Sequence, residues 1–154
     1  MDTKFSVAVH VLVLVSESPD PMTSDQMSES VGTNASYVRK VLGLLKGAGL
    51  VDSRQGARGY RLLASPEQVS LADVYRAVEG EGGGLLDIHQ NANDRCVVGR
   101  NIKPVLQGMF AEANEAFRQA LASRTLADCI AAIEARMGQS DGRGNEETTT
   151  EGQA

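Results

Sequence analysis

Two short helical patterns joined by a glycine turn constrain the fold of this 154-residue chain more than any other feature. Thr23 is followed three residues later by Gln26, which is the spacing of a capping box that opens a helix. That helix is expected to end near Val31, and Gly32 then permits a tight turn. Asn34 is a preferred N-cap for a second helix, because its side-chain oxygen can accept a hydrogen bond from a backbone N–H. Two short helices that meet at a glycine predict a helix-turn-helix.

A short hairpin is expected after the second helix. The apolar stripe of that helix stops at Gly47–Gly49, and strand-like residues at 50–53 and 60–63 flank a glycine-containing tip. An earlier segment, residues 3–16, fits both the alternation of a strand and one face of a helix, so its period does not decide between them. Helix, turn, helix and hairpin in this order are typical of a winged helix. The expected fold is therefore mainly α with a small β-wing.

The charged residues are distributed unevenly along the chain. The formal net charge is −5, which by itself argues against a partner rich in phosphate. Between Ser36 and Arg61, however, six cations occur with a single acid, Asp52. A basic segment within an acidic chain indicates a small unit that binds double-stranded DNA.

The expected DNA-binding residues lie at the start of the second helix, at the cap of the first and at the hairpin tip. In a helix-turn-helix, the N-terminal residues of the second helix face the base edges in the major groove. Arg39 can form the bidentate contact to guanine that a lysine cannot, with phosphate as the alternative target. Ser36, Tyr37 and Lys40 are expected to position the DNA backbone. The whole set is Thr23, Asn34, Ser36, Tyr37, Arg39, Lys40, Arg54 and Arg58.

The strongest helical pattern lies at residues 102–121, where apolar residues recur every three or four positions. This apolar face is larger than one small domain can bury, so we expect it to pair with a second copy of the chain. Such a homodimer would present two second helices to DNA half-sites about one helical turn apart. The alternative is that the face packs on the winged helix of its own chain. The residues expected in the dimer are Ile102, Val105, Leu106, Met109, Phe110, Ala113 and Phe117.

Four parts are expected along the chain. They are a winged helix-turn-helix domain (1–80), a sensor-type loop (81–101), the dimerisation helix with a C-terminal helix (102–137), and a disordered tail (138–154) that is almost without apolar residues. No apolar run is long enough for a membrane span and no secretory signal is convincing, so we expect a cytoplasmic protein.

Seven stretches of the chain carry a resemblance to a known family. They are residues 23–31, 37–42, 45–51, 53–54, 59–62, 71–74 and 79–80, which in this order cover most of residues 1–135. The ordered set resembles the Rrf2 family of bacterial winged-helix transcription regulators, the family of IscR, NsrR and CymR. The resemblance implies that residues 3–16 form a helix and that the long helix crosses its twin in a dimer.

The chain departs from the family pattern at two places. Arg58-Gly59 stands where the family usually has two glycines before the aromatic residue of the wing, which bears on how deeply the tip inserts into DNA. The cluster-binding members carry three closely spaced cysteines before the long helix, whereas this chain has Cys96 alone in that loop. Because iron–sulfur clusters are held by several thiolates, the chain looks like a member without a cluster, and no cofactor or metal is expected.

The residues and the resemblance together predict a homodimeric, sequence-specific transcription regulator with a palindromic operator, acting as a repressor. Two triggers stay open. Cys96 lies between Arg95 and Arg100, whose charges would favour the reactive thiolate, although a lone cysteine can also be inert. A small-molecule effector could instead bind between the winged helix and the long helix. Cys129 is expected to fill the core.

An enzyme is not expected, because the chain has no nucleophile elbow, phosphate-binding loop or zinc-protease motif and therefore no catalytic residues to assign. His89, Asp87 and Cys96 are too loosely spaced to predict a metal site. The alternative function is a winged-helix module that binds another protein without specific DNA binding. The basic segment argues against that alternative.

Overall fold

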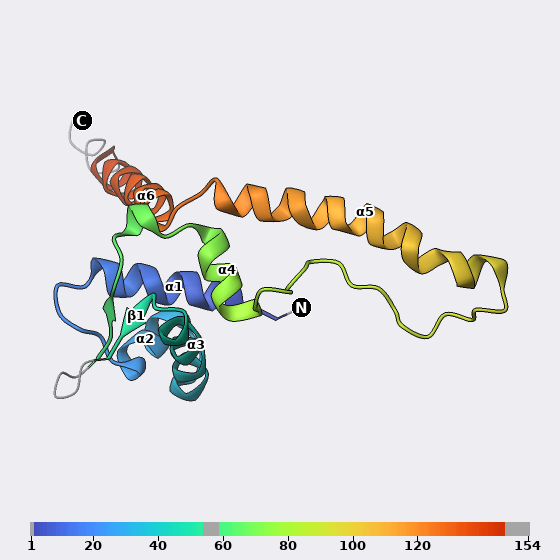
Figure 1. Cartoon of the computed structure of the whole chain (residues 1–154). Helices are drawn as coiled ribbons and strands as arrows, with labels where there is room; N and C mark the ends of the chain where they lie inside the picture. The colour runs from blue at the N-terminus through green and yellow to red at the C-terminus, as the bar shows by residue number, and fades with distance from the viewer. Residues whose placement is uncertain (1, 54–58, 147–154) are drawn as a thin grey trace.

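The computed structural model describes residues 2–53 and 59–146, with side chains up to residue 140 (Figure 1). In chain order the elements are α1 (Lys4–Glu17), α2 (Ser24–Val31), α3 (Ala35–Gly47), β1 (Val51–Asp52), β2 (Arg61–Leu62), the 3₁₀ turn η1 (Pro66–Gln68), α4 (Leu71–Glu79), α5 (Val97–Ala122) and α6 (Leu126–Glu146). The mainly helical fold with a small wing is confirmed. No described helix has the length and hydropathy needed to cross a membrane.

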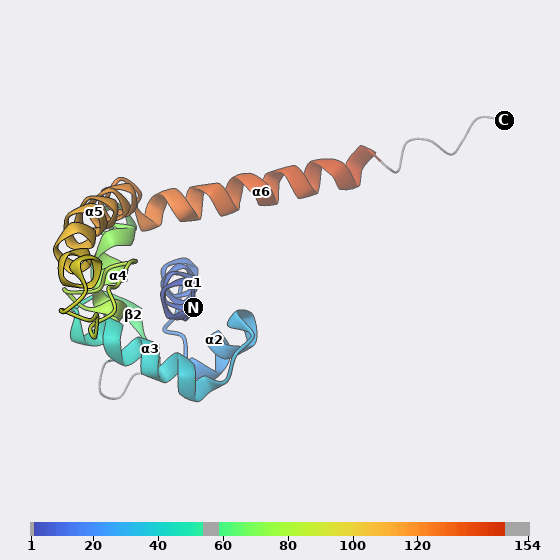
Figure 2. The same cartoon turned by 90° about the vertical axis from the view of Figure 1, so that its right-hand side faces the viewer.

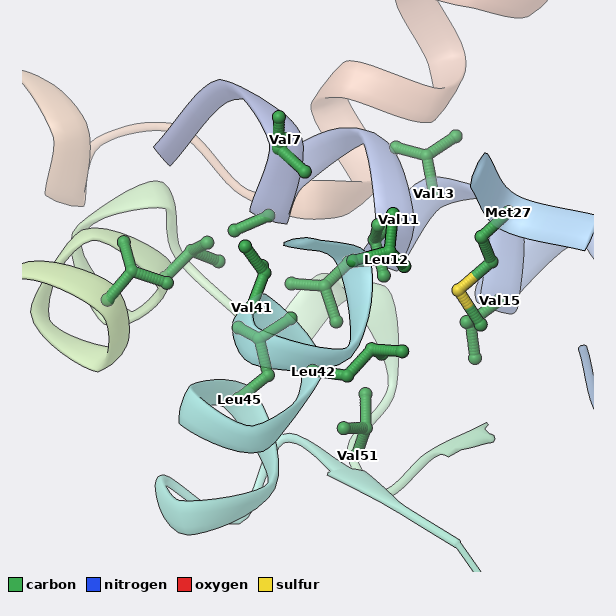
Figure 3. Close-up of a cluster of buried hydrophobic side chains, with 14 of the residues drawn as sticks. Val7, Val11, Leu12, Val13, Val15, Met27, Val41, Leu42, Leu45 and Val51 are labelled. Atoms are coloured by element: carbon green, nitrogen blue, oxygen red, sulfur yellow. The ribbon is translucent and has the colours of Figure 1, made fainter. Parts of the chain in front are cut away.

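Helix α1 resolves the segment whose period fitted both a strand and a helix. Its alternating valines lower helix propensity only slightly, and their burial against the other helices outweighs that cost. Val11 and Leu12 are fully buried, and Leu42 and Leu45 of α3 and Val51 of β1 join them in one cluster (Figure 3). The core thus lies where α1, α3 and the base of the wing converge.

The helix-turn-helix forms through the local bonds that the sequence predicts. Thr23 Oγ1 accepts from the backbone N–H of Gln26 at 3.2 Å, and the Gln26 side chain accepts from the N–H of Thr23 at 2.9 Å. Gly32 ends α2 at a φ of 78°, a left-handed conformation that favours glycine. Asn34 Oδ1 then accepts from the N–H of Tyr37 at 2.8 Å and opens α3.

The wing is a two-stranded antiparallel hairpin in which Val51 pairs with Leu62 and Asp52 with Arg61. A further bridge extends its base, because the N–H of Tyr60 donates to the carbonyl of Met22 at 2.8 Å. Gly59 has a φ of 118°, and a Cβ there would lie 2.6 Å from that same carbonyl oxygen. Only glycine therefore fits at this position. The hairpin tip, with Arg54 and Arg58, lies outside the described residues.

The loop 81–96 runs outward from α4 and lies alongside α5, which then leads back toward α6 (Figure 1). The helix starts at Val97, five residues before the start expected from the apolar pattern, so the expected loop 81–101 is too long. The first turn lies outside the apolar stripe from which the start of the helix was predicted. Within this turn the Asn101 side chain donates to the carbonyl of Val97 at 2.7 Å. The other end of α5 is fixed, since the N–H of Leu71 donates to the carbonyl of Arg124 at 2.9 Å.

The expected disordered tail is wrong for residues 138–146, because α6 continues to Glu146 (Figure 2). A capping box opens this helix, in which Thr125 Oγ1 accepts from the N–H of Asp128 at 3.1 Å. Once a helix is nucleated, each added residue gains a backbone hydrogen bond, so a helix can continue through a polar sequence. Residues 147–154, the rest of the expected tail, lie outside the described residues.

Candidate nucleic-acid interface

Helix α3 divides its residues between the core and the surface. Val38, Val41, Leu42 and Leu45 are fully buried, whereas Ser36, Arg39 and Lys40 are exposed. Positions 36, 39 and 40 are spaced three and four apart, so they share one helical face near the N-terminal end. The structure thus brings these three predicted DNA-binding residues together on a surface that faces away from the core.

Arg39 is held by two serines from different helices. Its Nη2 donates to Ser36 Oγ at 3.1 Å, and its Nη1 donates to Ser24 Oγ of α2 at 3.3 Å. A guanidinium carries more N–H groups than these two bonds use, so donors remain for a ligand. Ser24 is not among the predicted contacts, because its contact with Arg39 depends on how α2 and α3 cross. The result is an exposed cation with a fixed position.

The Tyr37 hydroxyl is already engaged within the chain. It donates to Asp2 Oδ1 at 3.0 Å, which ties the segment before α1 to the start of α3. This bond, followed by one from the N–H of Lys4, lowers the pKa of Asp2. Burial, followed by the bond to Asp2, raises the pKa of Tyr37. A phosphate contact by Tyr37 would therefore have to displace Asp2, a residue that the sequence pattern did not single out.

Thr23 and Asn34, the other predicted contacts that lie within the described residues, act as helix caps. The side-chain oxygen of each accepts a hydrogen bond from a backbone N–H of the helix that it caps. Their direct role is thus to fix the starts of α2 and α3. The O–H of Thr23 and the side-chain NH₂ of Asn34 remain as donors for a contact with DNA.

The predicted dimer residues divide into two groups. Val105 is 51% exposed and Met109 is 62% exposed, and no residue of α5 is buried. Phe117, by contrast, packs edge-on against Tyr75 of α4 with ring centroids 5.2 Å apart. The C-terminal part of α5 therefore packs on its own winged helix. In the N-terminal part Val105 and Met109 are exposed, whereas Ile102, Leu106 and Phe110 are half-buried within the single chain.

Cys96 is exposed at the N-cap of α5. Hydrogen bonding from the backbone N–H of Gly99, and secondarily from that of Val98, lowers the pKa of this thiol. The cause differs from the neighbouring arginines on which the sequence analysis relied. Cys129 is partly buried and packs against the core, as expected for a structural residue.

Comparisons with known proteins agree on one family. The Rrf2 family, described as iron-dependent transcriptional regulators, matches residues 1–132. YwnA of Bacillus subtilis, a candidate HTH-type transcriptional regulator, is 36% identical over 130 residues, which are 84% of this chain and 96% of YwnA. The solved structure of a candidate DNA-binding protein is 34% identical with a TM-score of 0.70, covering 82% of this chain and 98% of its own. T. potens IscR has a TM-score of 0.66 at 22% identity, covering 88% of this chain and 89% of IscR, and at this identity it shows the fold alone.

Proposed function

Because the chain belongs to the Rrf2 family of transcriptional regulators, we propose that it binds a palindromic operator as a homodimer and represses transcription in response to a signal. That it is a DNA-binding regulator follows from the family and its relatives. The observation that supports specific binding is the exposed face of α3, where Arg39 is held by Ser36 of the same helix and by Ser24 of α2. Repression is proposed because occupying a promoter is sufficient for it.

The test of specific binding is equilibrium titration of the full chain against its own upstream DNA and against a scrambled duplex. We expect the upstream DNA to bind at least about a thousandfold more tightly, which is the range of specific regulators. Affinity for both duplexes should fall as salt rises, because bound cations release counterions from the phosphates. Equal affinity for the two duplexes at every salt concentration would contradict the proposal and favour the protein-binding module.

The dimer is proposed from the exposed apolar side chains in the N-terminal part of α5. Val105 and Met109 are large side chains left in water by a single chain, and a second copy related by a two-fold axis would cover them. The same symmetry would suit a palindromic operator.

The family is described as iron-dependent, and the side chains that could bind iron in this chain are few. The sequence has two cysteines, of which Cys96 is exposed at the start of α5 and Cys129 is partly buried within α6. Among the described residues, no three histidine, cysteine or acidic side chains gather as a metal site would need. Thiolate-bound iron clusters take several cysteines in one place. The two separate cysteines do not fit such a cluster, and the proposed signal does not depend on one.

Oxidation of Cys96 is the first proposed signal. Because its pKa is lowered, the reactive thiolate persists at a lower pH than for an ordinary thiol. Alkylation by iodoacetamide, followed by mass spectrometry across pH, should therefore be faster at Cys96 than at Cys129 near neutral pH. Peroxide treatment is expected to change operator affinity at least about threefold, since the thiolate is the species that oxidises. Cys96→Ser should remove this response and the matched Cys129→Ser should retain it; a response that survives Cys96→Ser would rule out this sensor.

A further inference from the structure

A cavity of about 250 Å³ lies between α4, the glycine-rich turn that follows it, and the C-terminal part of α5. It is separate from the exposed face of α3, and its α5 residues begin at Glu115, beyond Val105 and Met109, from which the dimer is proposed. Neither the DNA-binding face nor the dimer face accounts for it.

Two arginines and two glutamates are among the residues that line the cavity. Arg118 Nη1 lies 3.6 Å from Glu115 Oε2, and Arg76 Nε lies 3.9 Å from Glu81 Oε1. Both arginines are about half exposed. Arg76 Nη1 also lies 3.5 Å from Asp73 Oδ1. These contacts are long and leave other guanidinium N–H groups available for the bidentate geometry that a carboxylate favours. The two glutamates can in turn accept from an ammonium group.

Apolar residues from α4 and α5 also line the cavity. Ala72 of α4 and Leu121 and Ala122 of α5 line it together with the ring of Tyr75. Burial raises the pKa of Tyr75, which accords with a ring held mostly away from water. An aliphatic side chain of a ligand can pack against these apolar groups.

The volume limits the ligand to a small molecule. Pockets for drug-sized ligands measure roughly 300–1,000 Å³, so a cavity of about 250 Å³ suits a smaller compound. A ligand with a carboxylate, an ammonium group and a short apolar chain would find arginines, glutamates and apolar side chains in this cavity. We propose that the cavity binds a free α-amino acid with an apolar side chain, and that this amino acid is an effector of DNA binding.

Tyr75 connects the cavity with both halves of the molecule. Its ring packs edge-on against Phe5 of α1 at 5.4 Å and against Phe117 of α5 at 5.2 Å. Helix α1 forms the core on which α3 is packed. A ligand against Tyr75 therefore touches the junction between the dimer helix and the DNA-binding unit. The effect on DNA rests on the proposed function, whereas the binding of the amino acid does not.

Calorimetric titration of the full chain without DNA tests the binding site. The probes are L-leucine, 4-methylpentanoate and 3-methylbutylamine, which share a branched aliphatic chain and differ in their charged groups. Saturable binding of leucine, at least about tenfold tighter than either singly charged probe, is expected because each lacks one charge-assisted contact. If leucine does not bind saturably, or if 4-methylpentanoate binds equally well, the proposed ligand class is wrong.

Variants of the walls assign the binding to this cavity. Arg118→Gln and Glu115→Gln are each expected to weaken leucine binding about tenfold or more. Arg136→Gln is the matched control, because Arg136 is exposed on α6 and does not line the cavity. Circular dichroism establishes that each variant is folded. Leucine binding that is unchanged in both cavity variants would overturn the site.

Operator titration with and without saturating leucine then separates this inference from the proposed function. We expect operator affinity to change at least about threefold, and the operator to change leucine affinity by the same factor, because coupling is reciprocal. Leucine binding with no operator binding would contradict only the proposed function. Operator binding that leucine leaves unchanged would contradict the effector role of the cavity.

Discussion

Replacing Val105 and Met109 together by aspartate is expected to convert the dimer to a monomer and to weaken operator binding by more than about a hundredfold. Both side chains are more than half exposed in the single chain, so the substitutions place charges where only a partner would be affected. Burying an uncompensated carboxylate in an apolar interface is strongly unfavourable. A monomer also loses the second half-site, whose binding in a dimer is effectively intramolecular.

Analytical ultracentrifugation and fluorescence anisotropy with operator DNA measure the two effects. The matched control is Gln107→Asp with Ala111→Asp, which adds the same charges at the same spacing to other exposed positions of α5. The control should remain dimeric and bind operator normally. A dimeric Val105→Asp, Met109→Asp variant would show that this face is not the interface.

Arg39→Ala is expected to weaken operator binding about tenfold to a hundredfold and to relax specificity at one base pair, as for the loss of a bidentate guanine contact. The serines on α2 and α3 hold the guanidinium in place before DNA arrives, so the contact needs little reordering. Ser24→Ala removes one of these supports and should have a smaller effect in the same direction.

Competition titrations against operators substituted at each position give the specificity profile. Lys40→Ala is the comparison, because an exposed lysine that binds phosphate should weaken all sequences about equally and reduce the salt slope by about one. If Arg39→Ala behaves in the same uniform way, Arg39 contacts phosphate, which is the alternative left open by the sequence.

Much of the fold could be predicted from the sequence because its signals are local. The capping residues Thr23 and Asn34 and the turn at Gly32 act on backbone groups within a few residues, and all three are confirmed. The same local reasoning placed the start of α5 too late and ended α6 too early. At the start of α5, Val97 and Val98 are exposed and outside the apolar stripe, and the end of α6 is polar, so neither end carries an apolar period.

The sequence by itself determined the helix-turn-helix, the basic segment from Ser36 to Arg61 and the absence of a three-cysteine motif, since these depend on neighbouring residues or on composition alone. The tertiary structure decided which residues work together. It joined Arg39 to Ser24, Tyr37 to Asp2, and Tyr75 to rings from two other helices. It also opened the cavity between α4 and α5. Such contacts depend on the angles at which helices pack, and those angles are set by the shared core, which no single segment of the chain specifies.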